Sequence, residues 1–149
     1  MKRISVGIVD PHPVHAEGVR VFLSHNDRFN VVGIGHSTSD IATICARDRP
    51  DFLVTEIDMG GNPFQEILGI SLSFPRIKTI VLTNTERKGD ITQALAGRAR
   101  GYVLKNRAKI DLIQAIDLAL NDKIYLSPSI GNSVIEIISL SIKRNSIVH

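Results

Sequence analysis

Five short apolar segments alternate with stretches of helical hydrophobic spacing, and this alternation constrains the fold more than any other feature of the sequence. The segments are short and rich in β-branched residues, which favours buried strands over helices. They cover residues 4–10, 30–35, 52–56, 77–83 and 101–104. Short connections between them predict right-handed crossovers, and hence an α/β fold with a five-stranded parallel sheet covered by helices on both faces.

The intervening segments predict helices, each with an apolar stripe. The expected helices begin near Pro13, after the capping candidates at 37–39, near Phe64, near Lys88 and near Lys109. A sixth helical pattern covers about 130–142 and is followed by a polar tail. We therefore expect one domain over residues 1–125 and a C-terminal linker helix and tail over 126–149.

Composition narrows the class of protein. Apolar residues make up 43% and charged residues 22%, which is typical of a globular chain. No apolar run approaches the roughly 18–20 residues that span a bilayer, and the first residues lack a signal-peptide pattern. The one cysteine, Cys45, excludes an intrachain disulfide and a four-cysteine zinc site. These features predict a cytoplasmic protein without a membrane segment.

Charge is distributed unevenly along the chain. Residues 1–75 hold six Lys or Arg and nine Asp or Glu, whereas residues 76–149 hold twelve and six. A basic half is compatible with nucleic acid, with an acidic protein partner or with a solvated basic face, and the sequence leaves these open.

Polar residues end four of the predicted strands. They are Asp10, Glu56, Thr83 and Lys105. Ligands of an open parallel sheet bind beyond the carboxyl ends of its strands, so we expect these side chains to converge. Two acids, a hydroxyl and an ammonium are suited to hold a phosphoryl group. One acid would act as the nucleophile and the other would hold a divalent cation, while the hydroxyl and the ammonium would bond the phosphoryl oxygens. The alternative is that strand ends are polar because they reach water.

Several motifs together resemble the receiver domain of bacterial two-component response regulators. They are IVDPHP at 8–13, EG at 17–18, VVG at 31–33, PD at 50–51, VLT at 81–83, GYVLK at 101–105 and YLSP at 125–128. The chain is most similar to receivers of the LuxR/NarL type, which precede a helix-turn-helix. The resemblance covers about residues 3–130 and implies a flavodoxin-like (CheY-like) fold.

The resemblance also implies roles for individual residues. Asp10 would belong to the acidic, metal-binding pocket, and Thr83 would be the switch hydroxyl. Tyr102 would be the aromatic switch, and Lys105 would contact the phosphoryl group. The phosphoacceptor position falls on Glu56, where the family has aspartate.

The departures from the family affect the chemistry directly. Glu56 extends its carboxylate by about 1.5 Å relative to aspartate, and a misplacement of that size can cost about a hundredfold in rate. The second pocket acid falls on Pro11, which has no side-chain oxygen ligand, and the proline usual four residues after the acceptor is Gly60. Asp58 could replace part of the acidic pocket. We expect magnesium to bind weakly at Asp10 or not at all, and no other cofactor.

These departures predict an atypical receiver that acts by protein–protein contacts and not by aspartyl phosphorylation. Glu56 either imitates the phosphorylated state or pairs with Lys105 in a fixed scaffold, and both readings stay open. One rival is a receiver that still accepts phosphate, on Asp58 or otherwise, as a fragment of a LuxR-type DNA-binding regulator. A remote rival is an enzyme on the same fold with Asp10 and Glu56 as acid and base. We do not expect this protein to be an enzyme.

Expected partners follow from the family. The face used for dimerisation and docking would be basic here, with a sensor kinase as a further partner. It would include Arg98, Arg100, Tyr102, Arg107 and Lys109. DNA binding would require a helix-turn-helix output domain, which residues 126–149 do not encode. A zinc site at His12 and His15 is disfavoured because it lacks clear further ligands.

Overall fold

A computed structural model describes the backbone of residues 2–148 and the side chains of residues 2–145. The strands are β1 Ile4–Val9, β2 Phe29–Gly35, β3 Phe52–Thr55, β4 Lys78–Thr83, β5 Gly101–Leu104 and β6 Tyr125–Leu126. The helices are α1 Pro13–Ser24, α2 Ser39–Asp48, α3 Pro63–Ser73, α4 Lys88–Ala96, α5 Ala108–Leu120 and α6 Pro128–Val148, with a 3₁₀ turn at Lys105–Arg107 before α5.

All strands pair in parallel, in the order β2-β1-β3-β4-β5-β6. The chain passes from β1 outward to β2 and then returns past β1 to β3, so the strand order reverses between β1 and β3. The predicted parallel α/β fold is confirmed. The sixth strand was not predicted, because two residues are too short to display a hydrophobic period.

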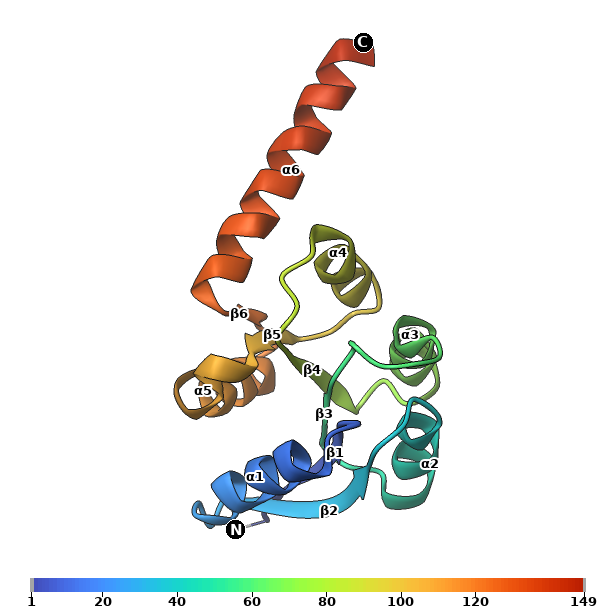
Figure 1. Cartoon of the computed structure of the whole chain (residues 1–149), viewed down its shortest axis with the longest axis vertical. Helices are drawn as coiled ribbons and strands as arrows, with labels where there is room; N and C mark the ends of the chain where they lie inside the picture. Colours follow the sequence, from blue (N-terminus) through green and yellow to red (C-terminus); the bar gives the residue numbers. More distant parts are fainter. Residues whose placement is uncertain (1, 149) are drawn as a thin grey trace.

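Helices cover both faces of the sheet (Figure 1). On one face, α1 and α5 pack on the largest core cluster through residues such as Leu23 and Ile116. On the other, α2, α3 and α4 bury Ile44, Ile67 and Ile91 against the sheet. Cys45 lies in this second layer, fully buried, and burial raises the pKa of its thiol to about 11. It is a core residue, as its place on an apolar stripe predicted.

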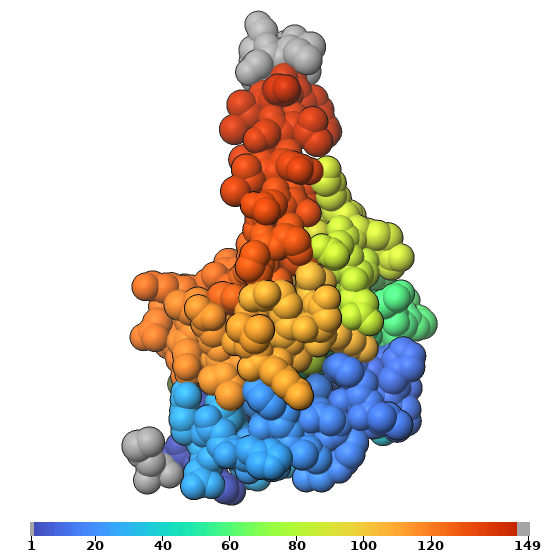
Figure 2. Space-filling view, turned by 60° about the vertical axis from the view of Figure 1, so that its left-hand side comes forward, coloured from blue at the N-terminus to red at the C-terminus, as the bar shows by residue number. Residues whose placement is uncertain are grey.

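The last helix, α6, projects from the body of the domain (Figures 1 and 2). Its first turns pack beside α4, with Ile130 fully buried and Ile137 partly so. The backbone stays helical to Val148, past residue 142 where the sequence predicted a tail. The extension is compatible with the sequence because neither glycine nor proline follows Gly131. No helix in the described residues is long and apolar enough to cross a membrane.

Candidate functional site

Three charged side chains meet where β1, β3 and β5 end. Lys105 Nζ lies 2.9 Å from Asp10 Oδ2 and 2.8 Å from Glu56 Oε1. The side chains of both acids are 4% exposed and that of Lys105 is 10% exposed. The structure brings Asp10, Glu56 and Lys105 together, and the three form one buried ion-pair cluster in which a single ammonium bridges two carboxylates.

Asp10 receives further hydrogen bonds from the chain that follows it. The backbone N–H of His12 donates to Oδ1 at 2.8 Å, and the Nδ1 atom of His15 lies 2.9 Å from Oδ2. Burial opposes ionisation of Asp10 and is the largest single influence on its pKa. The bonds from Lys105 and His12 nevertheless outweigh it, so the pKa of Asp10 lies below its usual value. The carboxylate is thus held as an anion.

The pKa of Lys105 is shifted in the opposite direction. Burial is the largest influence and favours the neutral amine, but the hydrogen bonds and charges of Asp10 and Glu56 outweigh it. The pKa of Lys105 is consequently raised, and the residue stays an ammonium.

Glu56 has its second oxygen occupied by its own backbone. Oε2 accepts from the N–H groups of Ile57, at 2.7 Å, and Asp58, at 3.0 Å. Both carboxylate oxygens therefore have hydrogen-bond partners inside the protein. The extra methylene of Glu56 lets the side chain reach Lys105 while it folds over these two amides.

The two residues expected to be switches lie deeper. Thr83 is fully buried, and its Oγ1 accepts from the N–H of Thr85 at 3.3 Å. Tyr102 is also fully buried and donates its hydroxyl to the Thr85 carbonyl at 2.8 Å. Burial, aided by the negative charges of nearby acids, raises the pKa of Tyr102. Both switch candidates bond to one backbone segment, at Thr85, and neither bonds to the ion-pair cluster.

Two sequence predictions need correction. Asp58 was expected to replace part of the acidic pocket, but its side chain is 64% exposed and lies 3.5 Å from Arg87. Its side chain points into solvent, and it is the carboxylate of Glu56 that accepts hydrogen bonds from the backbone N–H groups after β3. Tyr102 was placed on the basic contact face, yet its side chain lies in the core, bonded to Thr85.

The basic residues of that predicted face also divide among different surroundings. Arg107 donates to Asp111 at 2.8 Å, whereas Lys109 lines a groove between α1 and α5. Arg98 is exposed between α4 and β5, in a left-handed backbone conformation with φ of 69°. A single continuous basic face therefore stays a prediction.

The donor set at the strand ends does not fit a magnesium ion. Pro11 offers no side-chain oxygen, and the oxygens of Asp10 and Glu56 already accept hydrogen bonds. Across residues 2–145 no group of three His, Cys, Asp or Glu side chains is placed to hold a metal ion. His12 and His15, considered above for zinc, contact Asp10 instead.

His15, which contacts Asp10 beside the cluster, is a residue that sequence reasoning missed. The pair His12 and His15 was noted only as a weak metal motif, and nothing in the sequence aligns a helix side chain with a carboxylate five residues before it. His15 reaches Asp10 because α1 begins at Pro13, shortly after the end of β1, so that the first turn of the helix lies beside the Asp10 carboxylate.

The comparison with protein families identifies the family to which this fold belongs. The family model of the response regulator receiver domain matches residues 6–117. The chain belongs to this family. The receiver domain is also similar to a transcriptional regulatory protein DegU from Brevibacillus brevis, with 25% identity over 135 residues, which cover 90% of this chain and 57% of the relative. A nitrate/nitrite response regulator homologue from Haemophilus influenzae is 24% identical over 135 residues, covering 90% of this chain and 65% of the relative.

Solved structures extend the comparison. The isolated receiver domain of RcsB from Salmonella enterica serovar Typhimurium, with a phosphomimetic BeF3-, is 26% identical with a TM-score of 0.79, covering 89% of this chain and 99% of that one. A LuxR-family response regulator from Aurantimonas sp. has a TM-score of 0.85 at 22% identity, covering 93% and 99%, and supports the fold alone. This receiver is therefore related to response regulators of the LuxR/NarL type, and it spans 57% and 65% of the two curated relatives named above.

Proposed function

We propose that this receiver domain is a pseudo-receiver: it takes part in signalling through protein–protein contacts and is not switched by aspartyl phosphorylation. The observation that carries the proposal is the ammonium of Lys105, which bridges Glu56 and Asp10 in a buried cluster. In the family this lysine is expected to contact an incoming phosphoryl group. Here an internal carboxylate already occupies it.

Three features support the loss of phosphotransfer. The carboxylate of Glu56 is tied to Lys105 on one oxygen and to two backbone amides on the other, so attack would require breaking these bonds. A glutamate nucleophile is displaced by a methylene from the aspartate position, which disturbs in-line geometry. Pro11 and the saturated oxygens of Asp10 leave nothing to anchor the cation that would neutralise phosphoryl charge.

Of the two readings of Glu56, the geometry favours the fixed scaffold. Imitation of a phosphorylated state would engage both Lys105 and Thr83. Of these two residues, Lys105 contacts Glu56, whereas the hydroxyl of Thr83 accepts a hydrogen bond from the N–H of Thr85. We infer that the ion pair holds one conformation permanently and that the output does not depend on a chemical switch at this position.

Acetyl phosphate with magnesium tests the proposal, with intact-protein mass spectrometry as the readout. The unmodified chain should gain no phosphoryl group. The double variant Glu56→Asp with Pro11→Asp should be labelled, because it restores both the nucleophile and a cation ligand while Lys105 remains. Repair of either position alone should help little, since both defects act on one transition state. Glu66→Asp, on the first turn of α3 and away from the cluster, is the matched control and should stay unlabelled.

Labelling of the unmodified chain would contradict the proposal. If that label persists in Glu56→Ala and disappears in Asp58→Ala, the exposed Asp58 is the acceptor and the domain is an ordinary receiver.

The second candidate function is the receiver part of a LuxR-type DNA-binding regulator. The length comparison supports it, since the chain covers little more than half of the DegU relative. RcsB, 26% identical, has been solved as two dimers bound to two parallel DNAs. Dimerisation, DNA binding through another domain, a sensor kinase and a cytoplasmic location are proposals for this chain. Continuation of the encoding gene into a helix-turn-helix would decide in favour of this candidate.

A further inference from the structure

A groove runs between α1 and α5, next to the ion-pair cluster. Its volume is about 520 Å³, within the roughly 300–1,000 Å³ usual for small-molecule sites. The lining residues come from both helices and from the ends of β1 and β5: His12, Val14, His15, Gly18, Val19, Phe22, Lys105, Ala108, Lys109 and Leu112. Figure 2 shows α1, in blue, lying directly against α5, in orange, on this face.

The floor of the groove is apolar and belongs to the main core. Val19 and Leu112 are buried members of the core cluster, and Phe22 packs against it. Gly18 borders the open space of the groove, because a Cβ at this position would meet no atom within 4 Å. The groove therefore offers preformed apolar surface, which is the feature that binds the hydrocarbon part of a ligand.

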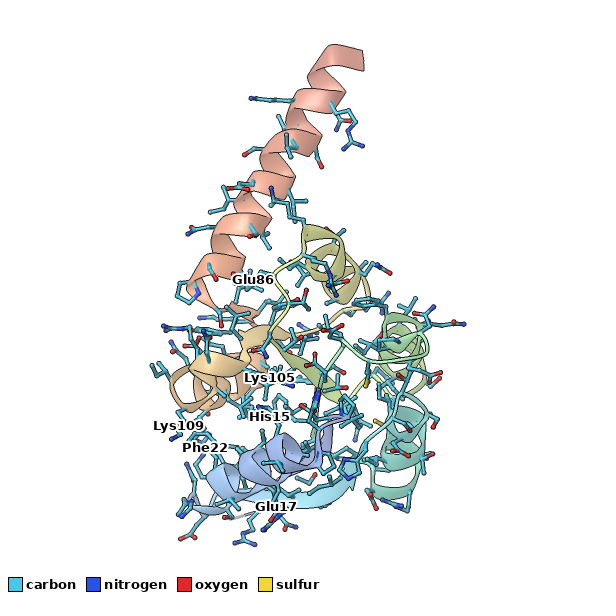
Figure 3. The ribbon with its side chains drawn as sticks, viewed as in Figure 1. His15, Glu17, Phe22, Glu86, Lys105 and Lys109 are labelled. Atoms are coloured by element: carbon cyan, nitrogen blue, oxygen red, sulfur yellow. The ribbon has the colours of Figure 1, made fainter. Side chains whose placement is uncertain are left out.

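The polar lining of the groove is basic throughout. No carboxylate is among its lining residues, whereas His12, His15, Lys105 and Lys109 are. Figure 3 shows His15, Lys105, Lys109 and Phe22 in the space between α1 and α5. A groove with an apolar floor and only cationic or neutral polar groups around it is complementary to an amphipathic anion.

Two of these polar groups have hydrogen-bonding capacity left. Lys105 bonds to Asp10 and Glu56, which use two of the three donors of an ammonium. His15 donates its Nδ1–H to the Asp10 carboxylate, so the Nε2 atom of the neutral ring is an acceptor that can bond a hydroxyl or a water molecule. Lys109, on the first turn of α5, is exposed and adds a third positive or polar contact.

We propose that this groove binds a small amphipathic monocarboxylate, with its hydrocarbon body on Val19, Phe22 and Leu112 and its carboxylate near Lys109 and the remaining N–H donor of Lys105. The ligand would touch two residues, His15 and Lys105, that also hold Asp10, so occupancy of the groove is coupled to the buried cluster. The proposal adds to the pseudo-receiver function and does not rest on it, since phosphoryl labelling and ligand binding are measured separately.

Titration with octanoate, followed by backbone amide NMR shifts of the ¹⁵N-labelled chain, tests the proposal. Octanol serves as the uncharged counterpart. Octanoate should give saturable shifts centred on His15, Gly18 and Ala108, and octanol should bind at least about threefold more weakly, because it lacks the charge that Lys105 and Lys109 recognise.

Three variants sharpen the test. Gly18→Leu fills the groove in an open helical position and should weaken octanoate binding at least about tenfold. Val14→Glu, on a side chain that is 88% exposed, places an acid in the groove lining without touching the core and should weaken binding about threefold. Lys109→Gln should weaken binding about two- to fivefold. Lys123→Gln, outside the groove, is the matched control and should bind as the unmodified chain does.

The proposal is overturned if octanoate and octanol bind equally, if the shifts centre elsewhere, or if Val14→Glu and Lys109→Gln both bind as the control does. It is also overturned if the unmodified chain is a dimer that Gly18→Leu or Val14→Glu converts to a monomer, because a second copy would then cover the groove.

Discussion

The receiver buries two aspartates, Asp10 and Asp111, and holds them in different ways. Asp10 shares one ammonium with a second carboxylate and draws its partners from the ends of separate strands. Asp111, fully buried, accepts from the Arg107 guanidinium and from the hydroxyls of Tyr125 and Ser127, each at 2.8 Å.

The two clusters differ in what they connect. The Asp111 cluster joins α5 to β6 and the start of α6, and Ser127 also accepts from the Leu104 N–H at 3.1 Å, which ties in β5. Its carboxylate shares its partners with no second acid, so the arrangement is a structural clasp. The Asp10 cluster brings two carboxylates and one ammonium together at the ends of three strands. A buried, paired carboxylate therefore does not by itself identify a functional site; the convergence of several strand ends does.

The largest expected effect comes from breaking the clasp. Asp111→Ala leaves two hydroxyls and a partly buried guanidinium without an acceptor, and should lower the free energy of unfolding by about 3–5 kcal/mol. Urea unfolding measures the loss. Asp117, on the same helix, pairs with Arg28 at the surface. Asp117→Ala should therefore lower the free energy of unfolding by about 1 kcal/mol or less. Equal losses in the two variants would refute the assignment of a clasp.

A smaller effect is expected from removing the shared cation of the other cluster. Lys105→Met leaves Asp10 and Glu56 facing each other without a counter-charge, and should cost about 2–3 kcal/mol at neutral pH. The cost should shrink in acid, where one carboxylate takes up a proton. Adding Glu56→Gln to Lys105→Met should recover part of the loss, because it removes the repulsion. If the double variant is no more stable than the single one, the two acids do not interact as the geometry indicates.

The pH dependence of stability compares the clusters directly. The pKa values of Asp10 and Asp111 both lie below 3.8, the value for an unperturbed Asp. Each carboxylate therefore stabilises the fold above that value, and its contribution is lost as the pH falls through the folded-state pKa. The free energy of unfolding should decline below about pH 4, and more shallowly in Asp111→Ala than in the unmodified chain. Parallel declines in the two proteins would contradict a contribution from Asp111.

The smallest expected change in the free energy of unfolding comes from a residue outside both clusters, and it serves as a reference for the larger changes. Gly18→Ala lies in the interior of α1, where an added methyl meets nothing. It should raise the free energy of unfolding by about 0.5–1 kcal/mol, because alanine costs less backbone entropy in a helix. Thermal or urea unfolding detects the gain. A loss of stability instead would mean that the open groove beside Gly18 is filled in solution.

Features that follow from the order of the strands could be predicted from the sequence, whereas features that depend on contacts between residues distant in the sequence could not. The meeting of Asp10, Glu56 and Lys105 followed from the sequence because parallel strands bring their carboxyl ends to one edge. The clasp did not, since Asp111 occupies an ordinary polar place in a helical pattern and its partner Ser127 lies 16 residues away. The interior position of Tyr102 depends on the loop that carries Thr85, whose path no periodicity specifies.

The projection of α6 has a mechanical consequence. A helix of 21 residues is about 30 Å long and bends little. Its first half packs beside α4 as far as Ile137, so a displacement of α4 would carry the helix with it. A tilt of about 5° of the whole helix would move its far end by about 3 Å, which is larger than the shift at its base.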